Sequence, residues 1–141
     1  MSTPEHPALW AERTGDRTYT GRSSSGATVA IGPDGTEGAF SPGDLLRIAL
    51  AACNLMSADR PIARRLGADF TGSVGVQTRK VPDENRYGDA QVEIVLDLRD
   101  LDEQARGDLR KVINNAVERG CTVGRTLEAG MPQQLSVTSE T

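Results

Sequence analysis

A helix without a polar face is the feature that most constrains how this chain of 141 residues can fold. The helix is predicted over residues 41–56, because Ser41 and Pro42 form a favourable N-cap and first helical residue. Between residues 48 and 56 no residue is charged, and Asn54 is the only strongly polar one. A helix that is apolar on all sides has to be covered on all sides. We therefore predict a sheet against one side of it and further protein against the other.

Composition and charge narrow the classes of function. The formal net charge of −4 argues against nucleic acid as the main partner, because phosphate binding requires a basic face. Aromatic residues make up only 4% of the chain, so small aliphatic residues must fill the core, which favours a partner subunit. No apolar run is long enough to span a bilayer, and the N-terminus carries no secretory signal pattern. We predict a cytoplasmic protein without a membrane partner, with a flexible tail over residues 1–8 and one domain over residues 9–141.

The chain contains two cysteines, Cys53 near the end of the apolar helix and Cys121 directly after Gly120. In a reducing cytosol a cysteine pair is more often catalytic, redox-active or metal-binding than a structural disulfide. A zinc site within one chain would need carboxylate ligands, because the only histidine is His6 in the predicted tail. We therefore predict no metal and no cofactor, and hypothesise that the fold brings the two sulfurs together. The alternative is a pair of buried cysteines that serve only as small core residues.

The rest of the chain shows alternating strand and helix patterns. Strands are predicted over residues 9–13, 17–22, 27–31, 70–81, 90–98 and 135–137. Helices are predicted over 61–66, after a break or kink at Pro61, over 101–119 with Asp102 as N-cap and Gly120 just past the end, and over 122–129. Arg17 and Tyr19 are expected on one face of their strand, and a long polar loop is expected over 81–89. This order predicts an α+β fold with a mostly antiparallel sheet packed on helices.

Two segments carry a resemblance to a known family. Ser41-Pro-Gly-Asp-Leu-Leu-Arg-Ile-Ala-Leu-Ala-Ala-Cys53-Asn-Leu-Met and Cys121-Thr-Val-Gly-Arg-Thr-Leu are similar to the two signatures of the OsmC/Ohr family. Its members are the osmotically inducible protein C and organic hydroperoxide resistance proteins. Both motifs occur at the separation typical of the family, and the order of strands and helices agrees from about Trp10 to Val137. The resemblance implies an OsmC-like α+β fold, with a mostly antiparallel sheet packed on a long buried helix, and an intertwined homodimer with two active sites at its interface.

The same resemblance implies a cysteine-based peroxidase that reduces organic hydroperoxides and sometimes hydrogen peroxide. Cys53 would form a sulfenic acid and Cys121 would resolve it as a disulfide, which an external dithiol of lipoyl or thioredoxin type would reduce. In the family an arginine from the N-terminal strands holds the thiolate and the peroxide. Arg17 is the better candidate for that role and Arg22 the weaker one.

The expected substrate contacts are Arg22, Asp44, Leu50 and Met56. Two positions depart from the family pattern. Many members carry a glutamate after the proline, where this chain has Gly43 followed by Asp44, so Asp44 is the available charge partner for the arginine. Thr122 stands where proline usually follows the second cysteine. The departures keep two alternatives open, a non-enzymatic dimer that binds a small apolar or electrophilic ligand, and a redox sensor.

Overall fold

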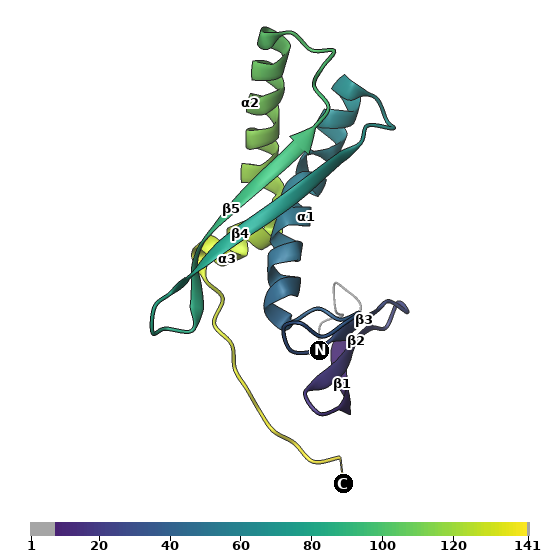
Figure 1. Ribbon diagram of the computed structural model, residues 1–141, viewed down its shortest axis with the longest axis vertical. Helices are drawn as coiled ribbons and strands as arrows, with labels where there is room; N and C mark the ends of the chain where they lie inside the picture. The colour runs from purple at the N-terminus through teal and green to yellow at the C-terminus, as the bar shows by residue number, and fades with distance from the viewer. Residues whose placement is uncertain (1–7, 141) are drawn as a thin grey trace, which may run out of the picture. The chain divides into compact units, whose positions relative to one another are not determined.

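The computed structural model describes residues 8–140 and confirms the predicted α+β class (Figure 1). The elements are β1 (Leu9–Gly15), β2 (Thr18–Ser23), β3 (Thr28–Ile31), α1 (Pro42–Leu66), β4 (Gly72–Val81), β5 (Arg86–Leu96), α2 (Glu103–Gly120) and α3 (Thr122–Ala129). The chain forms two compact units, one up to Ile48 and one from Ala49 onward. Apart from Ala8, the predicted tail lies outside the described residues, and the assignment of residues 9–141 to one domain stays a prediction.

The first unit is built on an antiparallel sheet with the strand order β1-β2-β3. Strand β1 continues to Gly15, and the chain reverses at Asp16 and Arg17. Arg17 has a φ of 55°, which is a left-handed conformation that belongs to a turn and not to a strand. The prediction that Arg17 shares a strand face with Tyr19 is therefore wrong.

Helix α1 runs without interruption from Pro42 to Leu66 and includes Pro61. Proline cannot donate a backbone hydrogen bond, so the carbonyl of Ser57 has no donor in the next turn. The helix nevertheless continues, because Ala58 and Ile62 on either side of the proline are fully buried in the core. The predicted break before a separate helix over 61–66 is therefore wrong, and tertiary packing outweighs the local preference of proline.

In the second unit, β4 and β5 form an antiparallel hairpin that pairs Val74 with Ile94 and Val76 with Val92. These residues are less exposed than their neighbours, as the predicted alternation requires. The predicted loop over 81–89 is too long, because only residues 82–85 separate the strands. Asp83 and Asn85 adopt left-handed φ values of 68° and 50°, which allow the chain to reverse within four residues.

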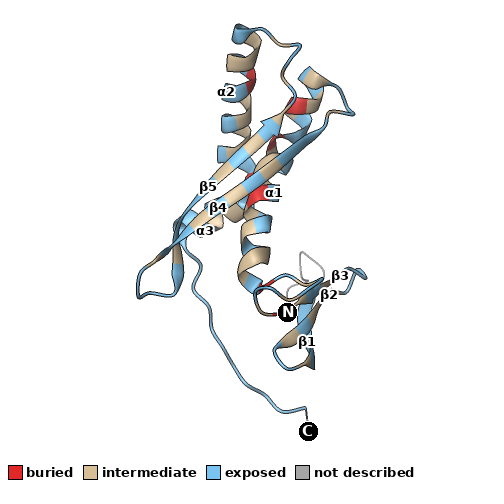
Figure 2. Ribbon diagram, in the orientation of Figure 1, coloured by how far each residue is buried: buried red, intermediate tan, exposed pale blue. Residues whose placement is uncertain are grey.

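The core of the second unit lies where α1 meets α2. Ala58, Ile62 and Leu109 are buried there, and apolar side chains from the hairpin and from α2 pack around them. Figure 2 shows buried segments on both α1 and α2. Asp102 is the N-cap of α2 as predicted, with its Oδ1 accepting the backbone N–H of Ala105 at 2.8 Å. Gly120 is the last residue of α2 and does not lie beyond its end as predicted. Helix α3 has its predicted bounds.

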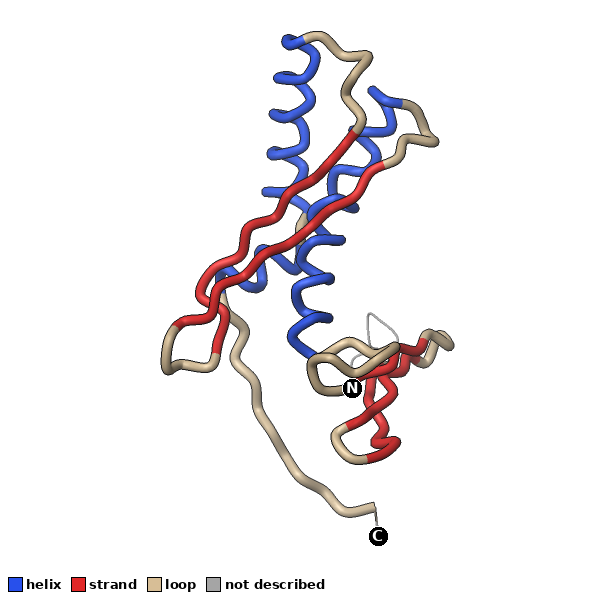
Figure 3. The backbone as a smooth tube through the Cα atoms, viewed as in Figure 1, coloured by secondary structure: helices blue, strands red, loops and turns tan. Residues whose placement is uncertain are grey.

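Residues 131–140 follow α3 as an exposed segment without regular structure (Figure 3), so the predicted strand over 135–137 is absent. Leu135 and Val137 are 87% and 92% exposed and find no apolar partner that would hold a strand in place. Along α1, Met56 is 74% exposed and Ile48 44%. A single chain thus leaves much of its apolar surface uncovered. Within residues 8–140, no helix combines the length and apolarity needed to cross a membrane.

Candidate active site

The structure brings the two cysteines together in the second unit. Cys53 lies on α1, and Cys121 occupies the junction at which α2 ends and α3 begins. Both are free thiols, and their side chains are hydrogen-bonded to each other. Cys121 is buried, with only 2% of its surface exposed, whereas Cys53 is partly exposed. The site therefore holds one buried cysteine and one that is partly exposed.

Packing on both sides of Cys53 fixes the position of Cys121. One turn after Cys53, Ser57 lies against Gly120, where an added Cβ would be 3.7 Å from the Ser57 Cβ. One turn before it, the Leu50 side chain lies 3.7 Å from where a Cβ of Gly124 would be. The α2–α3 junction thus rests on α1 directly over Cys53.

The backbone of Gly124 comes close to the Cys121 sulfur, so a larger residue at this position would crowd it. Its N–H donates to Cys121 Sγ at 3.4 Å, and a Cβ at this position would be only 3.2 Å from the sulfur. Cys121 itself is the N-cap of α3, so its sulfur takes the place that an oxygen usually has at a helix start. The Cys-Thr-Val-Gly segment therefore combines a sulfur N-cap with a glycine that gives it room.

The pKa of Cys53 is lowered, although its environment contains opposing effects. Burial alone would raise the pKa, because it disfavours the charged thiolate. Hydrogen bonds from the backbone N–H of Val123, the Cys121 side chain, the Ser57 side chain and the backbone N–H of Thr122 favour the thiolate and outweigh burial. Two of these donors belong to the first turn of α3, where the helix dipole also favours negative charge. In the described part of the chain, the groups that shift this pKa include no arginine.

The Ser57 hydroxyl has a second acceptor besides the Cys53 sulfur. It donates to the carbonyl oxygen of Cys53 at 2.6 Å, a bond between successive turns of α1. A hydroxyl has one proton and serves one acceptor at a time. The backbone N–H of Val123 is the largest of the effects that favour a Cys53 thiolate, and the N–H of Thr122 adds to it from the same turn of α3.

Cys121 shows the opposite shift. Burial raises the pKa of its thiol, the neighbouring Cys53 and the more distant Glu128 add to the rise, and the N–H of Gly124 only partly offsets it. The side-chain amide of Asn54 donates to the backbone carbonyl of Leu50 at 2.9 Å and also toward Cys121 Sγ at 3.6 Å. In the hydrogen bond between the two thiols, Cys121 is therefore the donor and Cys53 the acceptor.

The other predicted charged residues belong to the first unit, and Cys53 belongs to the second. Arg17 lies in the β1–β2 turn. Arg22 on β2 forms an ion pair with Glu12, 3.4 Å between Nε and Oε2, in which both side chains are about half exposed. The roles of Arg17 and Arg22 at the thiol stay predictions.

Asp44 serves the start of α1. Its Oδ2 accepts the N–H of Ser41 at 3.0 Å, and its own N–H donates to Ser41 Oγ at 3.0 Å, which completes a reciprocal capping arrangement. The Ser41 N–H, followed by the Ser41 hydroxyl and Arg47, lowers the pKa of this carboxyl against the opposing effect of burial. Its ion-pair partner is Arg47, at 2.6 Å from Nη2 to Oδ1, an arginine that the sequence did not single out.

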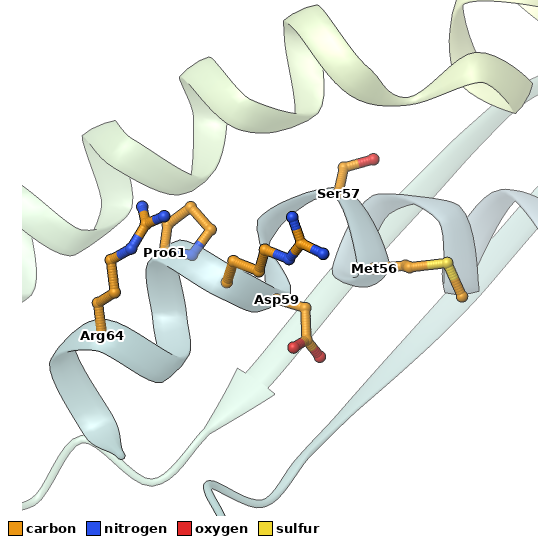
Figure 4. A pocket seen from close by; sticks show the side chains of 6 residues that line it. Met56, Ser57, Asp59, Pro61 and Arg64 are labelled. Carbon is orange, nitrogen blue, oxygen red and sulfur yellow. The ribbon is translucent and has the colours of Figure 1, made fainter. Parts of the chain in front are cut away.

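Two hollows border the site. One of about 570 Å³ lies along α1 and is lined by Met56, Ser57, Asp59, Arg60, Pro61 and Arg64 (Figure 4). The other, of about 520 Å³, lies between β5 and α2 and has mainly apolar walls, which include Ile94 and Ile113. Asn54 is part of its wall and connects it to Cys121. Within residues 8–140, no group of three histidine, cysteine, aspartate or glutamate side chains is placed to hold a metal ion.

Sequence reasoning missed the donors around the sulfurs. Asn54 was visible as the one strongly polar residue in an apolar stretch, directly beside Cys53, and this was a usable signal. Thr122 and Val123 act through their backbone N–H groups, so their side chains gave no indication. Leu50 lies against Gly124, and Met56 lines the hollow along α1; their role as substrate contacts stays a prediction.

Comparison with known proteins agrees with the two-motif resemblance. A family model described as OsmC-like protein matches residues 34–136. An uncharacterised protein of Mycobacterium tuberculosis strain H37Rv is 49% identical over 129 residues, which cover 92% of this chain and 94% of that protein.

Two solved structures show the same fold at low sequence identity. An osmotic stress induced and detoxification response protein from Psychrobacter arcticus is 21% identical, covers 89% of this chain and 91% of its own, and gives a TM-score of 0.66. The organic hydroperoxide resistance protein OhrB of Bacillus subtilis is 20% identical, covers 84% and 90%, and gives a TM-score of 0.53. With the family model matching most of its length and both cysteines inside the matched region, this chain belongs to the OsmC-like protein family.

Proposed function

We propose that this protein is a thiol peroxidase that reduces organic hydroperoxides, with Cys53 as the attacking thiolate and Cys121 as the resolving thiol. One observation carries the proposal. The two sulfurs are in contact, and their surroundings shift their pKa values in opposite directions, down for Cys53 and up for Cys121. A peroxidase of this kind needs an accessible thiolate beside a thiol that keeps its proton until the second step.

The chemistry follows from this division. The Cys53 thiolate attacks the terminal oxygen of the hydroperoxide, the O–O bond breaks, and the alkoxide takes up a proton and leaves as an alcohol. Sulfur is oxidised to a sulfenic acid, and the peroxide oxygen is reduced. Cys121 then attacks that sulfur, an S–S bond forms, and the hydroxyl leaves as water with the Cys121 proton. A dithiol from outside the protein reduces the disulfide and restores both thiols.

The surroundings favour an organic peroxide over a small polar one. The hollow between β5 and α2 offers mainly apolar walls beside the Asn54–Cys121 contact, and an alkyl group gains free energy when it leaves water for such a surface. Arg17, or in its place Arg22, would bind the peroxide and the developing charge, as an arginine does in the family. Asp44 would support this charge through the start of α1.

We also propose that the active form is an intertwined homodimer. In the single chain Met56, Ile48 and Val95 are 74%, 44% and 51% exposed, and large apolar residues rarely stay uncovered in such numbers along one helix and hairpin. Sedimentation at micromolar concentration should give twice the mass of the chain, and a monomer would contradict this part of the proposal.

The test of the reaction is a count of thiols. Reduced protein is mixed with an excess of cumene hydroperoxide, and free thiols are titrated over time. We expect two thiols to disappear per chain, with cumyl alcohol as product and a Cys53–Cys121 disulfide in the peptide map. Dihydrolipoamide or reduced thioredoxin should then restore both thiols. Unchanged thiol content after prolonged exposure would show that the protein is not a peroxidase.

A non-enzymatic ligand-binding dimer is the other function considered from the sequence. It would be favoured by sulfurs that lie too far apart to bridge. The hydrogen bond between the two thiols instead favours the redox proposal.

A further inference from the structure

The Cys53–Cys121 pair holds one proton between two sulfur atoms. Both thiols are free, and the Cys121 thiol donates its hydrogen bond to the Cys53 sulfur. The proton is a cation of charge +1, and sulfur is a soft ligand atom. A soft metal ion of the same charge can therefore take the place of this proton, which is chemistry that does not involve a peroxide.

The small number of ligands limits which metal the pair can bind. Structural zinc sites take four protein ligands, catalytic zinc sites take three, and iron–sulfur clusters take four. Within residues 8–140, no three histidine, cysteine, aspartate or glutamate side chains come together in this way. The absence of a metal was predicted from the number of zinc ligands, and an ion that needs only two sulfurs is not covered by it. Thiolates also select Cu(I), which two sulfurs can satisfy in a linear arrangement.

Exchange of the proton for Cu(I) leaves the charge of the site unchanged. The Cys53 thiolate and the Cys121 thiol together carry one negative charge. When Cu(I) binds, a Cu–S bond forms to each sulfur, the S–H bond of Cys121 breaks, and its proton goes to water. The S–Cu–S unit again carries one negative charge, and neither copper nor sulfur changes its oxidation state. The groups that stabilise the thiolate in the metal-free pair therefore also suit the copper complex.

Four N–H donors already point at the two sulfurs. Backbone N–H groups of residues 122–124 supply three of them, two at Cys53 and one at Cys121 Sγ, the latter at 3.4 Å. The Asn54 side-chain amide adds a second donor toward Cys121 Sγ at 3.6 Å. Hydrogen bonds to metal-bound sulfur orient the ligands and tune the metal. Each sulfur thus has the outer support that a metal thiolate requires.

The two sulfurs are also held together before an ion arrives. Cys121 lies at the α2–α3 junction with only 2% of its surface exposed. Gly120 in that junction lies against Ser57 of α1, where an added Cβ would be 3.7 Å from the Ser57 Cβ. Ligands that are already in place lose little conformational freedom on binding.

Met56 carries the next sulfur along α1 and is the other soft ligand to consider. It follows Cys53 by three residues, but 74% of its surface is exposed. Most of its side chain therefore faces water and not the buried Cys121. We expect the ion to have two sulfur ligands and not three.

We propose that Cys53 and Cys121 together bind one Cu(I) ion as two thiolate ligands. This inference goes beyond the proposed peroxidase function and does not depend on it, because binding requires only that the pair is reduced. Copper and peroxide would use the same sulfur lone pairs. The reduced protein therefore binds either copper or peroxide at this pair, and the disulfide form binds neither.

The experiment is an anaerobic titration of the reduced full chain with the Cu(I) acetonitrile complex, followed by the ultraviolet absorption of the copper–thiolate bonds. Affinity is measured by competition with the Cu(I) chelator bathocuproine disulfonate. We expect one ion per chain, two sulfur neighbours in the X-ray absorption spectrum, and protection of both thiols from iodoacetamide. No binding, or one ion for every two chains, would overturn the proposal, the latter by placing the ion between copies.

Single-site variants identify the ligands. Cys53→Ser and Cys121→Ser each leave one thiolate and should weaken Cu(I) binding by about a hundredfold or more. Met56→Leu should keep the wild-type affinity and spectrum. Wild-type affinity in both cysteine variants would assign the copper to adventitious surface groups, and a loss in Met56→Leu equal to theirs would show a different ligand set. Either result would overturn the proposal. The stoichiometry and the sulfur count come from the wild type, so they decide the matter even if a cysteine variant does not fold.

Two further measurements separate copper binding from other properties of the pair. Asn54→Ala should weaken Cu(I) binding by about tenfold, because it removes an N–H donor from the bound Cys121 sulfur, while Asn115→Ala should not. Protein oxidised with diamide should bind no Cu(I), and undiminished binding after oxidation would overturn the proposal. A protein that binds Cu(I) but loses no thiol to cumene hydroperoxide would keep this inference and lose the proposed peroxidase function.

Discussion

The middle of α1 and the α2–α3 junction each hold a cysteine, and the two sulfurs touch, yet their environments act in opposite directions. At Cys53 burial is outweighed by N–H groups that point at the sulfur from the first turn of α3. At Cys121 burial prevails, and the neighbouring Cys53 raises the pKa further. The residue type is the same in both places, so the difference lies in where backbone donors point. The start of one short helix thus helps to make one thiol of a pair the stronger acid.

The largest effect should come from exchanging each sulfur for oxygen. Cys53→Ser should reduce peroxide consumption to the uncatalysed rate, because a serine hydroxyl at neutral pH carries almost no negative charge. Cys121→Ser should keep the first turnover and stop there, with a sulfenic acid on Cys53 that dimedone traps and mass spectrometry detects.

Both variants are also compared in the steady state with a dithiol reductant. Both variants should consume peroxide slowly in the steady state. Only the single-turnover measurement therefore distinguishes the role of Cys53 from that of Cys121. If Cys121→Ser fails in the first turnover while Cys53→Ser succeeds, the assignment of the two sulfurs is reversed.

The second-largest effect should come from removing a backbone N–H of α3 that donates to the Cys53 sulfur. Thr122→Pro removes the N–H that Thr122 offers to Cys53 but keeps the helix, because proline is favourable at the first helical position. A hydrogen bond from this N–H favours the charged thiolate, so its loss should raise the pKa of Cys53. The measurement is the pH dependence of iodoacetamide alkylation of Cys53, whose midpoint should move to higher pH.

Thr122→Ala serves as the control, since it keeps the N–H and removes only the side chain. Its profile should follow that of the wild type. A shift in Thr122→Ala as large as that in Thr122→Pro would show that the threonine side chain, and not its backbone, stabilises the thiolate.

The backbone donors at Cys53 could not be predicted from the sequence, and the reason is physical. Ser41, Asp102 and the apolar alternation of β5 act through side-chain chemistry over a few residues, and the elements they define were predictable. Thr122 and Val123 act through backbone N–H groups whose direction depends on how the α2–α3 junction rests on α1. No side-chain pattern encodes such a direction. The resemblance brought Cys53 and Cys121 to attention, but the reason for their unequal acidity came from three-dimensional packing.

The same reasoning explains the errors. Pro61 was expected to interrupt the helix because its local preference is clear, while the burial of Ala58 and Ile62 that overrides it depends on distant residues. The alternation of Leu135 and Val137 is that of a strand, but a strand needs a neighbour to pair with, and the single chain supplies none to this segment. We expect this segment to change on dimerisation if it pairs with a second copy.

A smaller effect is expected at Cys121 from Asn54→Ala. The amide donates toward Cys121 Sγ at 3.6 Å, a long and weak bond that favours the thiolate of the resolving cysteine. Its loss should slow disulfide formation by a few fold, about 1 kcal/mol or less, and leave the attack of Cys53 on peroxide unchanged. Stopped-flow measurement of the two phases separates these steps.

Asn115→Ala offers a matched control for Asn54→Ala. Asn115 is an exposed asparagine on α2, and the structure gives it no contact with either sulfur. Both phases should keep their wild-type rates. If Asn54→Ala slows the first phase instead of the second, its amide would act on Cys53, and the environments of the two cysteines would be less distinct than their contacts indicate.

The smallest effect should come from Ser57→Ala. The Ser57 hydroxyl lies near Cys53 Sγ, but its 2.6 Å hydrogen bond to the Cys53 carbonyl occupies its only proton for much of the time. Removing it should therefore raise the pKa of Cys53 by less than Thr122→Pro does, with the same alkylation profile as the measurement. Because a higher pKa leaves a smaller fraction of thiolate, the alkylation rate at pH 7 should fall slightly in Ser57→Ala and clearly in Thr122→Pro. If Ser57→Ala shifted the midpoint as far as Thr122→Pro does, the thiolate would depend on a side chain of its own helix, and the start of α3 would not be what distinguishes the two cysteines.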